Sequence, residues 1–176
     1  MRKVKVIIVG GGLSGIACAR KLQERNIDFL LLEASDRLGG RVRTESGDGF
    51  LFDCGFQTCC KAFQSVFHYF SIGLAQLPIG GMGQIPLNLA KAIKPERVLL
   101  NRKVVSVSKN VVQLEDGDEV SADAVVLALN VDSLREFLPE IPLPRTNSVS
   151  NFYFESENLW RCSWRCFNWG CSCKWN

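Results

Sequence analysis

The sequence predicts an α/β domain built on a parallel sheet, because two short apolar runs flank an amphipathic helix. Residues 4–9 are mostly β-branched and contiguous, which is typical of a strand buried on both faces. The segment that follows has one apolar and one charged face at helical spacing. A second apolar run spans 29–32 and ends at Glu33, so residues 4–33 form one βαβ unit.

A glycine-rich turn, Gly10-x-Gly12-x-x-Gly15, joins the first strand to the helix. In such a turn the first glycine permits the tight bend, the second leaves room for a pyrophosphate, and the third lets the helix pack close to the sheet. The first helical turn, which contains Leu13 and Ser14, offers unpaired N–H groups and a partial positive charge to phosphates. We therefore expect a Rossmann-type dinucleotide site; a purely structural turn is the alternative.

Glu33 ends the second strand, 18 residues after Gly15. A carboxylate in this place accepts hydrogen bonds from ribose hydroxyls and disfavours a 2′-phosphate. The strand before the glycines, the helix after them and the acid at this distance together favour nucleotide binding over a structural turn. An NADP site is not expected.

The next segment separates a flavin site from a nicotinamide site. Its pattern over residues 33–44, E-A-x-x-R-x-G-G-R-x-x-T, resembles the flavin amine oxidase superfamily. That group includes monoamine and polyamine oxidases, protoporphyrinogen oxidase and the phytoene-type desaturases. The resemblance implies that the chain binds FAD, and the chemistry agrees, because glycines let the backbone approach a flat ligand and arginine pairs well with phosphate. The cofactor-binding residues implied in this segment are Glu33, Ala34, Arg37, Gly39, Gly40 and Arg41.

Later motifs extend the resemblance to most of the chain, residues 4–60 and 62–158. The pattern D-G-F-x-x-D-x-G-F-Q occupies 48–57, and P-x-G-G-M-x-x-I-P occupies 78–86. In relatives a strand further on holds the adenine through its backbone, and the resemblance implies this role for Val104. These details favour a desaturase-like branch of the superfamily.

Apolar runs, alternation and turn signals predict strands over 50–52, 111–114, 122–129 and 148–154. The resemblance implies two further elements, a helix over 87–93 and a strand over 98–107. The acidic turn 116–118 closes a small antiparallel hairpin within 104–121, and its acids are expected to be solvated. The predicted fold is thus a Rossmann-type FAD-binding domain in three layers, with an inserted antiparallel β-hairpin and the remnant of a substrate domain.

Two features depart from the family pattern. Gln57 and Pro78 are 21 residues apart, whereas in relatives most of the substrate domain lies between these motifs. Residues 160–176 hold all four tryptophans, three basic residues and no acid. We interpret the gap as a skipped exon or a deletion, and the tail as a shifted reading frame or a retained intron.

Zinc binding is the alternative interpretation of the tail. The candidate ligands are Cys162, Cys166, Cys171 and Cys173. Their spacing fits no pair of zinc knuckles, so no metal is expected.

These features divide the chain into five segments. They are an N-terminal FAD-binding part (1–60), a remnant linking segment (61–97), a returning FAD-binding part (98–138), a substrate-domain remnant strand (139–158) and an atypical tail (159–176).

The composition argues against several other classes of protein. Residues 1–159 carry 18 Lys+Arg and 18 Asp+Glu, and no basic stripe predicts nucleic-acid binding. No apolar run approaches the length of about 18 residues that a transmembrane helix needs. The irregular spacing of the cysteines and the lack of a secretory signal or transit peptide predict the cytoplasm or another reducing compartment. The family resemblance leaves a plastid open, and the oligomeric state is not predicted.

The function that the resemblance implies is FAD-dependent oxidation of a small molecule, either an amine or an apolar polyene. In such enzymes the flavin carries the chemistry, which agrees with a chain whose single histidine offers no Ser/His/Asp arrangement and no catalytic residue. Because of the gap and the tail, we expect this truncated form not to turn over. The alternatives are a non-catalytic nucleotide-binding remnant and the NAD-binding domain of a dehydrogenase, of which the Gly-Gly-Arg motif disfavours the second.

Overall fold

A computed structural model of the 176-residue chain describes residues 2–54, 78–146 and 153. The chain forms two compact units, Met1–Gly40 with Pro86–Asn147, and Arg41–Ile85 with Ser148–Asn176. The five-segment division of the sequence stays a prediction, and its boundaries at 60 and 158 lie outside the described residues. Within the described part, no helix is long and apolar enough to cross a membrane.

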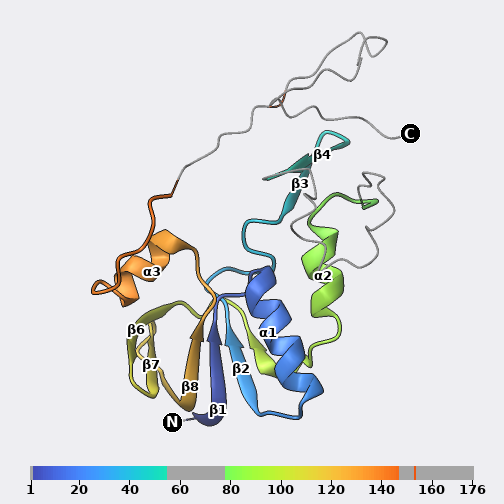
Figure 1. Cartoon of the computed structure of the whole chain (residues 1–176). Coiled ribbons are helices and arrows are strands. Elements are labelled where there is room, and N and C mark those ends of the chain that lie inside the picture. Colours follow the sequence, from blue (N-terminus) through green and yellow to red (C-terminus); the bar gives the residue numbers. More distant parts are fainter. Residues whose placement is uncertain (1, 55–77, 147–152, 154–176) are drawn as a thin grey trace. The chain divides into compact units, whose positions relative to one another are not determined.

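The first unit is built on a mixed sheet of six strands (Figure 1). The strands are β1 (Arg2–Val9), β2 (Phe29–Leu32), β5 (Val98–Leu99), β6 (Val104–Ser108), β7 (Val111–Leu114) and β8 (Glu119–Leu127). Their order is β5-β2-β1-β8-β7-β6, and the four strands from β5 to β8 in this order run parallel. β7 is antiparallel to both of its neighbours. It forms the expected hairpin with β8, across the acidic turn 116–118, and a second one, the β6–β7 hairpin, with β6.

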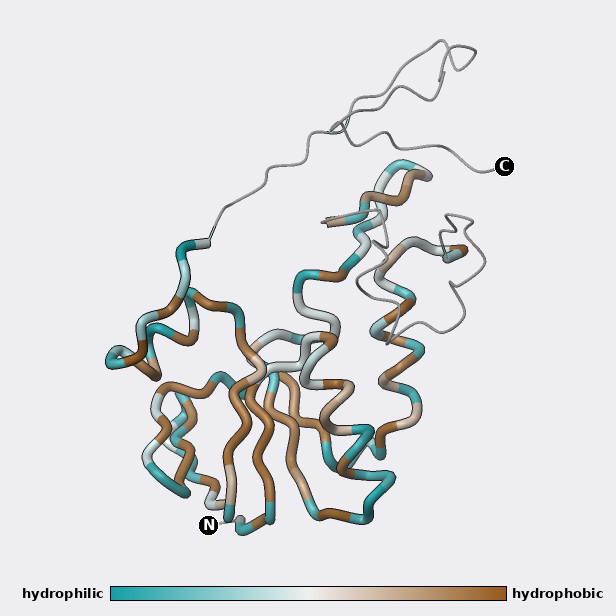
Figure 2. The backbone as a smooth tube through the Cα atoms, in the orientation of Figure 1, coloured by the Kyte–Doolittle hydropathy of each residue, from teal (hydrophilic) through white to brown (hydrophobic). Residues whose placement is uncertain are grey.

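The strands β1 and β2 are buried on both faces, because their side chains alternate between two cores. On one face they pack against helix α1 (Leu13–Glu24), in a core that holds Ile8, Ile16, Ala19, Phe29 and Leu31. On the other face they pack against the hairpin, in a core that includes Ile7, Val9, Leu30, Leu32, Val112 and Leu114. Figure 2 shows the apolar colour running along these strands. The predicted α/β, Rossmann-like fold is thus confirmed, with α1 on one face of these strands and the β6–β7 hairpin on the other.

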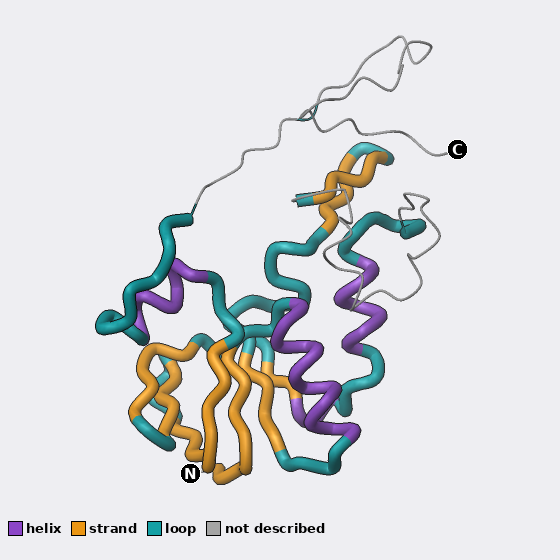
Figure 3. The backbone as a smooth tube through the Cα atoms, viewed as in Figure 1, coloured by secondary structure: helices purple, strands orange, loops and turns teal. Residues whose placement is uncertain are grey.

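Some element bounds differ from those expected. The strand expected over 98–107 is two strands, because the chain turns at Asn101, whose φ is 54°. The helix expected over 87–93 begins earlier, as α2 (Gln84–Ala90), and a 3₁₀ turn, η3 (Pro95–Arg97), precedes β5. Of the strand expected over 148–154, only Tyr153 is described, and it lies in no strand. Figure 3 marks these elements along the chain.

The helix α3 (Val131–Phe137) was not expected from the sequence. The side chain of Asn130 caps its start by accepting a hydrogen bond from Ser133 N at 2.8 Å. Asparagine is among the preferred N-cap residues, so the cap, rather than apolar periodicity, was the signal for this helix.

The second unit contains a hairpin of β3 (Thr44–Gly47) and β4 (Phe50–Asp53), of which only the second strand was expected. Its two loop residues, Asp48 and Gly49, have φ values of 50° and 80°. Positive φ at both central residues, and an Asp-Gly sequence, are typical of the type I′ turn that matches the twist of paired strands.

The carboxylate of Asp53 connects this hairpin to the segment Pro78–Ile85, which follows much later in the chain. Asp53 is buried, with 8% of its surface exposed. It accepts hydrogen bonds from Thr44 Oγ1 at 2.5 Å and from Met82 N at 2.8 Å. Thr44 Oγ1 in turn accepts from Gly83 N at 2.8 Å. Gly81 has to be glycine here, because a Cβ would lie 2.4 Å from Thr44 Oγ1.

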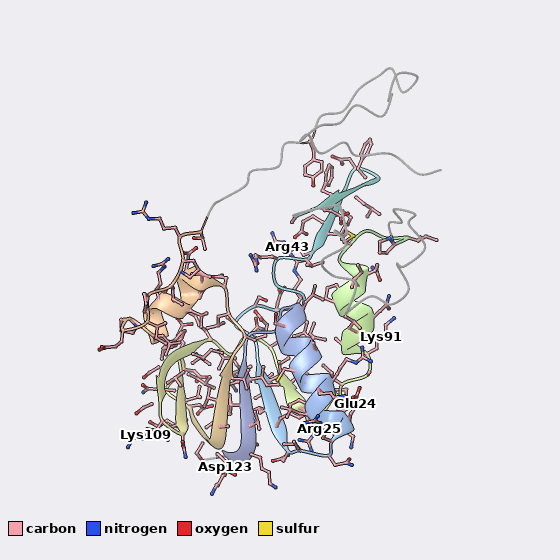
Figure 4. The ribbon with its side chains drawn as sticks, viewed as in Figure 1. Glu24, Arg25, Arg43, Lys91, Lys109 and Asp123 are labelled. Atoms are coloured by element: carbon pink, nitrogen blue, oxygen red, sulfur yellow. The ribbon has the colours of Figure 1, made fainter. Side chains whose placement is uncertain are left out.

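We predict that Asp53→Ala lowers the free energy of unfolding by about 1–3 kcal/mol, because the buried Met82 N and the half-buried Thr44 hydroxyl lose their acceptor. Chemical denaturation followed by circular dichroism measures this. The control is Asp123→Ala, since Asp123 is exposed on β8 (Figure 4), and its effect should stay within about 0.5 kcal/mol. Equal unfolding midpoints for the two variants would contradict the structural role of Asp53.

Candidate nucleotide-binding site

The turn from β1 into α1 has contacts that only glycine permits. Gly10 has φ of 105°, and a Cβ on it would lie 2.6 Å from the carbonyl oxygen of Ala128. A Cβ on Gly15 would lie 1.9 Å from the carbonyl oxygen of Gly10. The helix therefore starts in direct contact with the end of β1, as expected for the first and third glycines of the motif.

The middle glycine of the motif faces open space instead. Gly12 is the N-cap of α1, with φ of −71° and ψ of −178°, which any residue can adopt. Apart from Gly12 itself and its two neighbours in the chain, no heavy atom lies within 4 Å of the position that its Cβ would occupy. The first turn of α1, which includes Leu13 and Ser14, contains no acidic residue to offset the positive end of the helix. The space above Gly12 is thus bordered by backbone N–H groups of a helix start.

The second glycine pair lies directly beside this turn. Gly39 N donates to the carbonyl oxygen of Gly11 at 2.8 Å, and Gly39 pairs with Gly12 in an isolated parallel bridge. A Cβ on Gly40 would lie 3.2 Å from the Cα of Gly12, and Gly40 has φ of 59°. The two glycine motifs, far apart in the sequence, therefore form one continuous backbone surface.

Glu33 lies at the same end of the sheet, and its carboxylate is half-buried. Its Oε2 accepts from Gly11 N at 2.6 Å. Its Oε1 accepts from Ser35 N at 2.9 Å and from Ser35 Oγ at 2.8 Å. The acid is thus fixed beside the glycine turn, where the sequence predicted it.

The other residues expected at the site lie in the segments that follow Glu33 and Gly40, or in β6. Ala34 and Arg37 are exposed on the segment after Glu33. Arg41 is exposed and begins the second unit. The side chain of Val104 is buried in the core between sheet and hairpin, so only its backbone can face a ligand.

Sequence reasoning missed Gly11 and Ser35, which both contact the Glu33 carboxylate. Gly11 occupies a variable position of the glycine motif, yet a Cβ there would lie 2.4 Å from Leu38 Cδ2 and 2.9 Å from Glu33 Oε2. The signal for Gly11 was the third consecutive glycine; for Ser35 it was a hydroxyl two residues after the acid.

The described residues fit the ADP half of a dinucleotide. Open space over Gly12 and the N–H groups of a helix start suit a pyrophosphate, and the Glu33 carboxylate suits hydroxyl donors. Glycines have no side chain that could take part in a reaction. The role that this arrangement can have is therefore to bind and orient a ligand.

The described residues contain no other constellation of catalytic or metal-binding groups. No group of three or more His, Cys, Asp or Glu among them could hold a metal ion, and the four tail cysteines lie outside the described residues. Cys18 and Cys54 are free thiols, and burial raises the pKa of the Cys18 thiol, which disfavours the reactive thiolate. The acids of the β7–β8 turn are exposed, and Arg102 binds two of them, Asp116 and Asp118.

Comparison with known protein families assigns both parts of the sequence. Residues 8–72 match an NAD(P)-binding Rossmann-like domain, and residues 71–158, half of the chain, match the flavin containing amine oxidoreductases. The chain belongs to the flavin-containing amine oxidoreductase family. The resemblance seen in the sequence motifs is thereby confirmed.

Individual relatives agree with this assignment. Polyamine oxidase 2 of Arabidopsis thaliana is 46% identical over 54 residues, which are 31% of this chain and 11% of that protein. The 4,4′-diaponeurosporene oxygenase of Staphylococcus haemolyticus is 37% identical over 71 residues, 39% of this chain and 14% of that one. A putrescine oxidase structure bound to putrescine shares the fold, with a TM-score of 0.63 at 16% identity, over 77% of this chain and 60% of that chain. The chain thus spans only a small part of the length of these curated relatives.

We predict opposite effects for alanine at two glycines of the motif. Gly12→Ala should leave the free energy of unfolding within about 0.5 kcal/mol of wild type, because its backbone is unstrained and its Cβ meets nothing. It should weaken ADP binding about tenfold or more, because the methyl group fills the space above the turn.

Gly15→Ala should instead destabilise the fold by about 1–3 kcal/mol or more, because the added methyl collides with backbone. Thermal unfolding and calorimetric titration with ADP measure both variants. A Gly12→Ala protein that binds ADP as well as wild type would show that the open space is not the ligand site.

Proposed function

We propose that this chain binds the ADP half of FAD and so forms the nucleotide-binding part of a flavin-dependent oxidoreductase. The observation that carries the proposal is the open space over Gly12, at the start of α1 and beside the Gly39–Gly40 pair, with the Glu33 carboxylate bound to the neighbouring Gly11 N. Family membership supports flavin as the cofactor, and the acid at position 33 supports a ribose without a 2′-phosphate.

Each part of the site has a distinct task in this proposal. The N–H groups at the start of α1 bind the pyrophosphate, and Glu33 accepts hydrogen bonds from the ribose. Gly39 and Gly40 let the backbone run close to the ligand, and Val104 contributes backbone to the adenine. Arg41 pairs with phosphate oxygens. Flavin, when bound, supplies the redox chemistry, and these residues orient it.

As the reaction of the oxidoreductase to which this site belongs, we propose oxidation of an amine or of an apolar polyene. The names of the relatives support both classes, since one is a polyamine oxidase and another acts in the diaponeurosporene series. The motifs at 48–57 and 78–86 favour the polyene class. The described residues that converge on the site hold the nucleotide, so they do not select between the two substrates.

We predict that Glu33→Ala weakens ADP and FAD binding by about 1–3 kcal/mol, because a charge-assisted hydrogen bond to the ribose is lost. Calorimetric titration measures both ligands. The matched control is Glu24→Ala at the end of α1 (Figure 4), where the carboxylate is exposed and pairs with Lys21. If both variants bound ADP and FAD with equal affinity, Glu33 would not be part of the binding site.

The same titrations test the competing functions. Binding of NAD as tight as that of FAD would favour a dehydrogenase domain. A folded protein that binds neither ADP nor FAD would contradict the proposed function altogether. Tight binding of both ADP and FAD supports it.

We predict that the 176-residue chain does not turn over substrate. Flavin held by its ADP half leaves the ring mobile, and a misplacement of about 1 Å can cost on the order of a hundredfold in rate. The measurement is anaerobic flavin absorbance after addition of putrescine, longer polyamines or carotenoid precursors. Bleaching that depends on one of these compounds would overturn the prediction and identify the substrate class.

A further inference from the structure

The backbone around Glu33 is fixed by a neighbouring loop of the same unit. Glu33 N donates to the carbonyl oxygen of Leu99 at 2.9 Å, and Arg102 N donates to the carbonyl oxygen of Glu33 at 2.8 Å. Asn101 N donates to the carbonyl oxygen of Ser35 at 2.9 Å. Three hydrogen bonds therefore hold the residues 33–35 in place before any ligand binds.

The side chain of Glu33 is fixed as well, from two directions. Gly11 N holds Oε2 at 2.6 Å. Ser35 holds Oε1 twice, with its backbone N at 2.9 Å and its Oγ at 2.8 Å. Ser35 Oγ also lies 2.8 Å from the carbonyl oxygen of Arg37, so its one hydrogen is shared between two acceptors.

An ionised carboxylate has about four acceptor positions, and three of them are taken here. The remaining position is on Oε2. Ser35 is exposed, and its Oγ donates to Oε1. The position on Oε2 is therefore left to accept a hydroxyl of the ribose diol.

We propose that Ser35 is a positioning residue that fixes Glu33 for the ribose diol, and so sets a preference for ribonucleotides over nucleotides that lack these hydroxyls. This inference rests on the proposed function, since it concerns the ribose end of the same site. Ser35→Ala removes the hydroxyl but keeps the backbone N–H, so one of the two hydrogen bonds from Ser35 to Glu33 Oε1 remains.

The test is calorimetric titration of the full chain with ADP and with 2′,3′-dideoxy-ADP. Ser35→Ala should weaken ADP binding about 3–10-fold and leave dideoxy-ADP binding unchanged within about twofold. Ser35→Thr keeps a hydroxyl at this exposed position and should restore the affinity for ADP. The control is Ser108→Ala, an exposed serine at the end of β6, which should change neither affinity.

Two outcomes would overturn the inference. An unchanged ADP affinity in Ser35→Ala would show that the hydroxyl does not position Glu33. An equal loss for ADP and dideoxy-ADP would show a general disturbance of the turn. Glu33→Ala, titrated in parallel, separates this inference from the proposed function: if it weakens ADP binding and Ser35→Ala does not, only the role of Ser35 fails.

Discussion

The close contact between the start of α1 and the end of β1 is the constraint on which the proposed nucleotide site depends. Gly15 and Gly10 meet so closely that no side chain fits between them. This contact places the first N–H groups of the helix beside Gly39 and Gly40, which in turn lie against Gly12. The other parts of the site, the Gly39–Gly40 pair and Glu33, lie around this glycine turn, which presents backbone rather than side chains.

The acid of the site depends on tertiary contacts from elsewhere in the chain. The loop between β5 and β6 fixes Glu33 and Ser35 through backbone hydrogen bonds, and the same loop leads into the hairpin that covers the other face of the sheet. The second unit has its own organising group, the buried carboxylate of Asp53. That group joins segments on both sides of residues 55–77, so the motifs at 48–57 and 78–86 are connected through one buried carboxylate.

Sequence reasoning succeeded where a pattern is local. The βαβ unit follows from two apolar runs, a helical period and a glycine turn, and its strands are buried on both faces as expected. It failed where tertiary contacts decide, as at Gly11 and Ser35, whose importance appears only once Glu33 is placed between them. The strand β3 was missed although Asp48-Gly49 is a strong hairpin signal, because the polar residues before it show no apolar alternation.

The most direct test of the central claim is a map of the backbone amides that respond to ADP, recorded by ¹H–¹⁵N correlation NMR on the full chain. The site described here predicts that the largest shifts belong to Gly11–Gly15, Glu33–Ser35 and Gly39–Gly40, while α3 stays unchanged. Shifts gathered instead around the cavity of about 230 Å³ that Leu30, Leu99 and Val120 help to line would contradict it. So would a spectrum that ADP leaves unchanged.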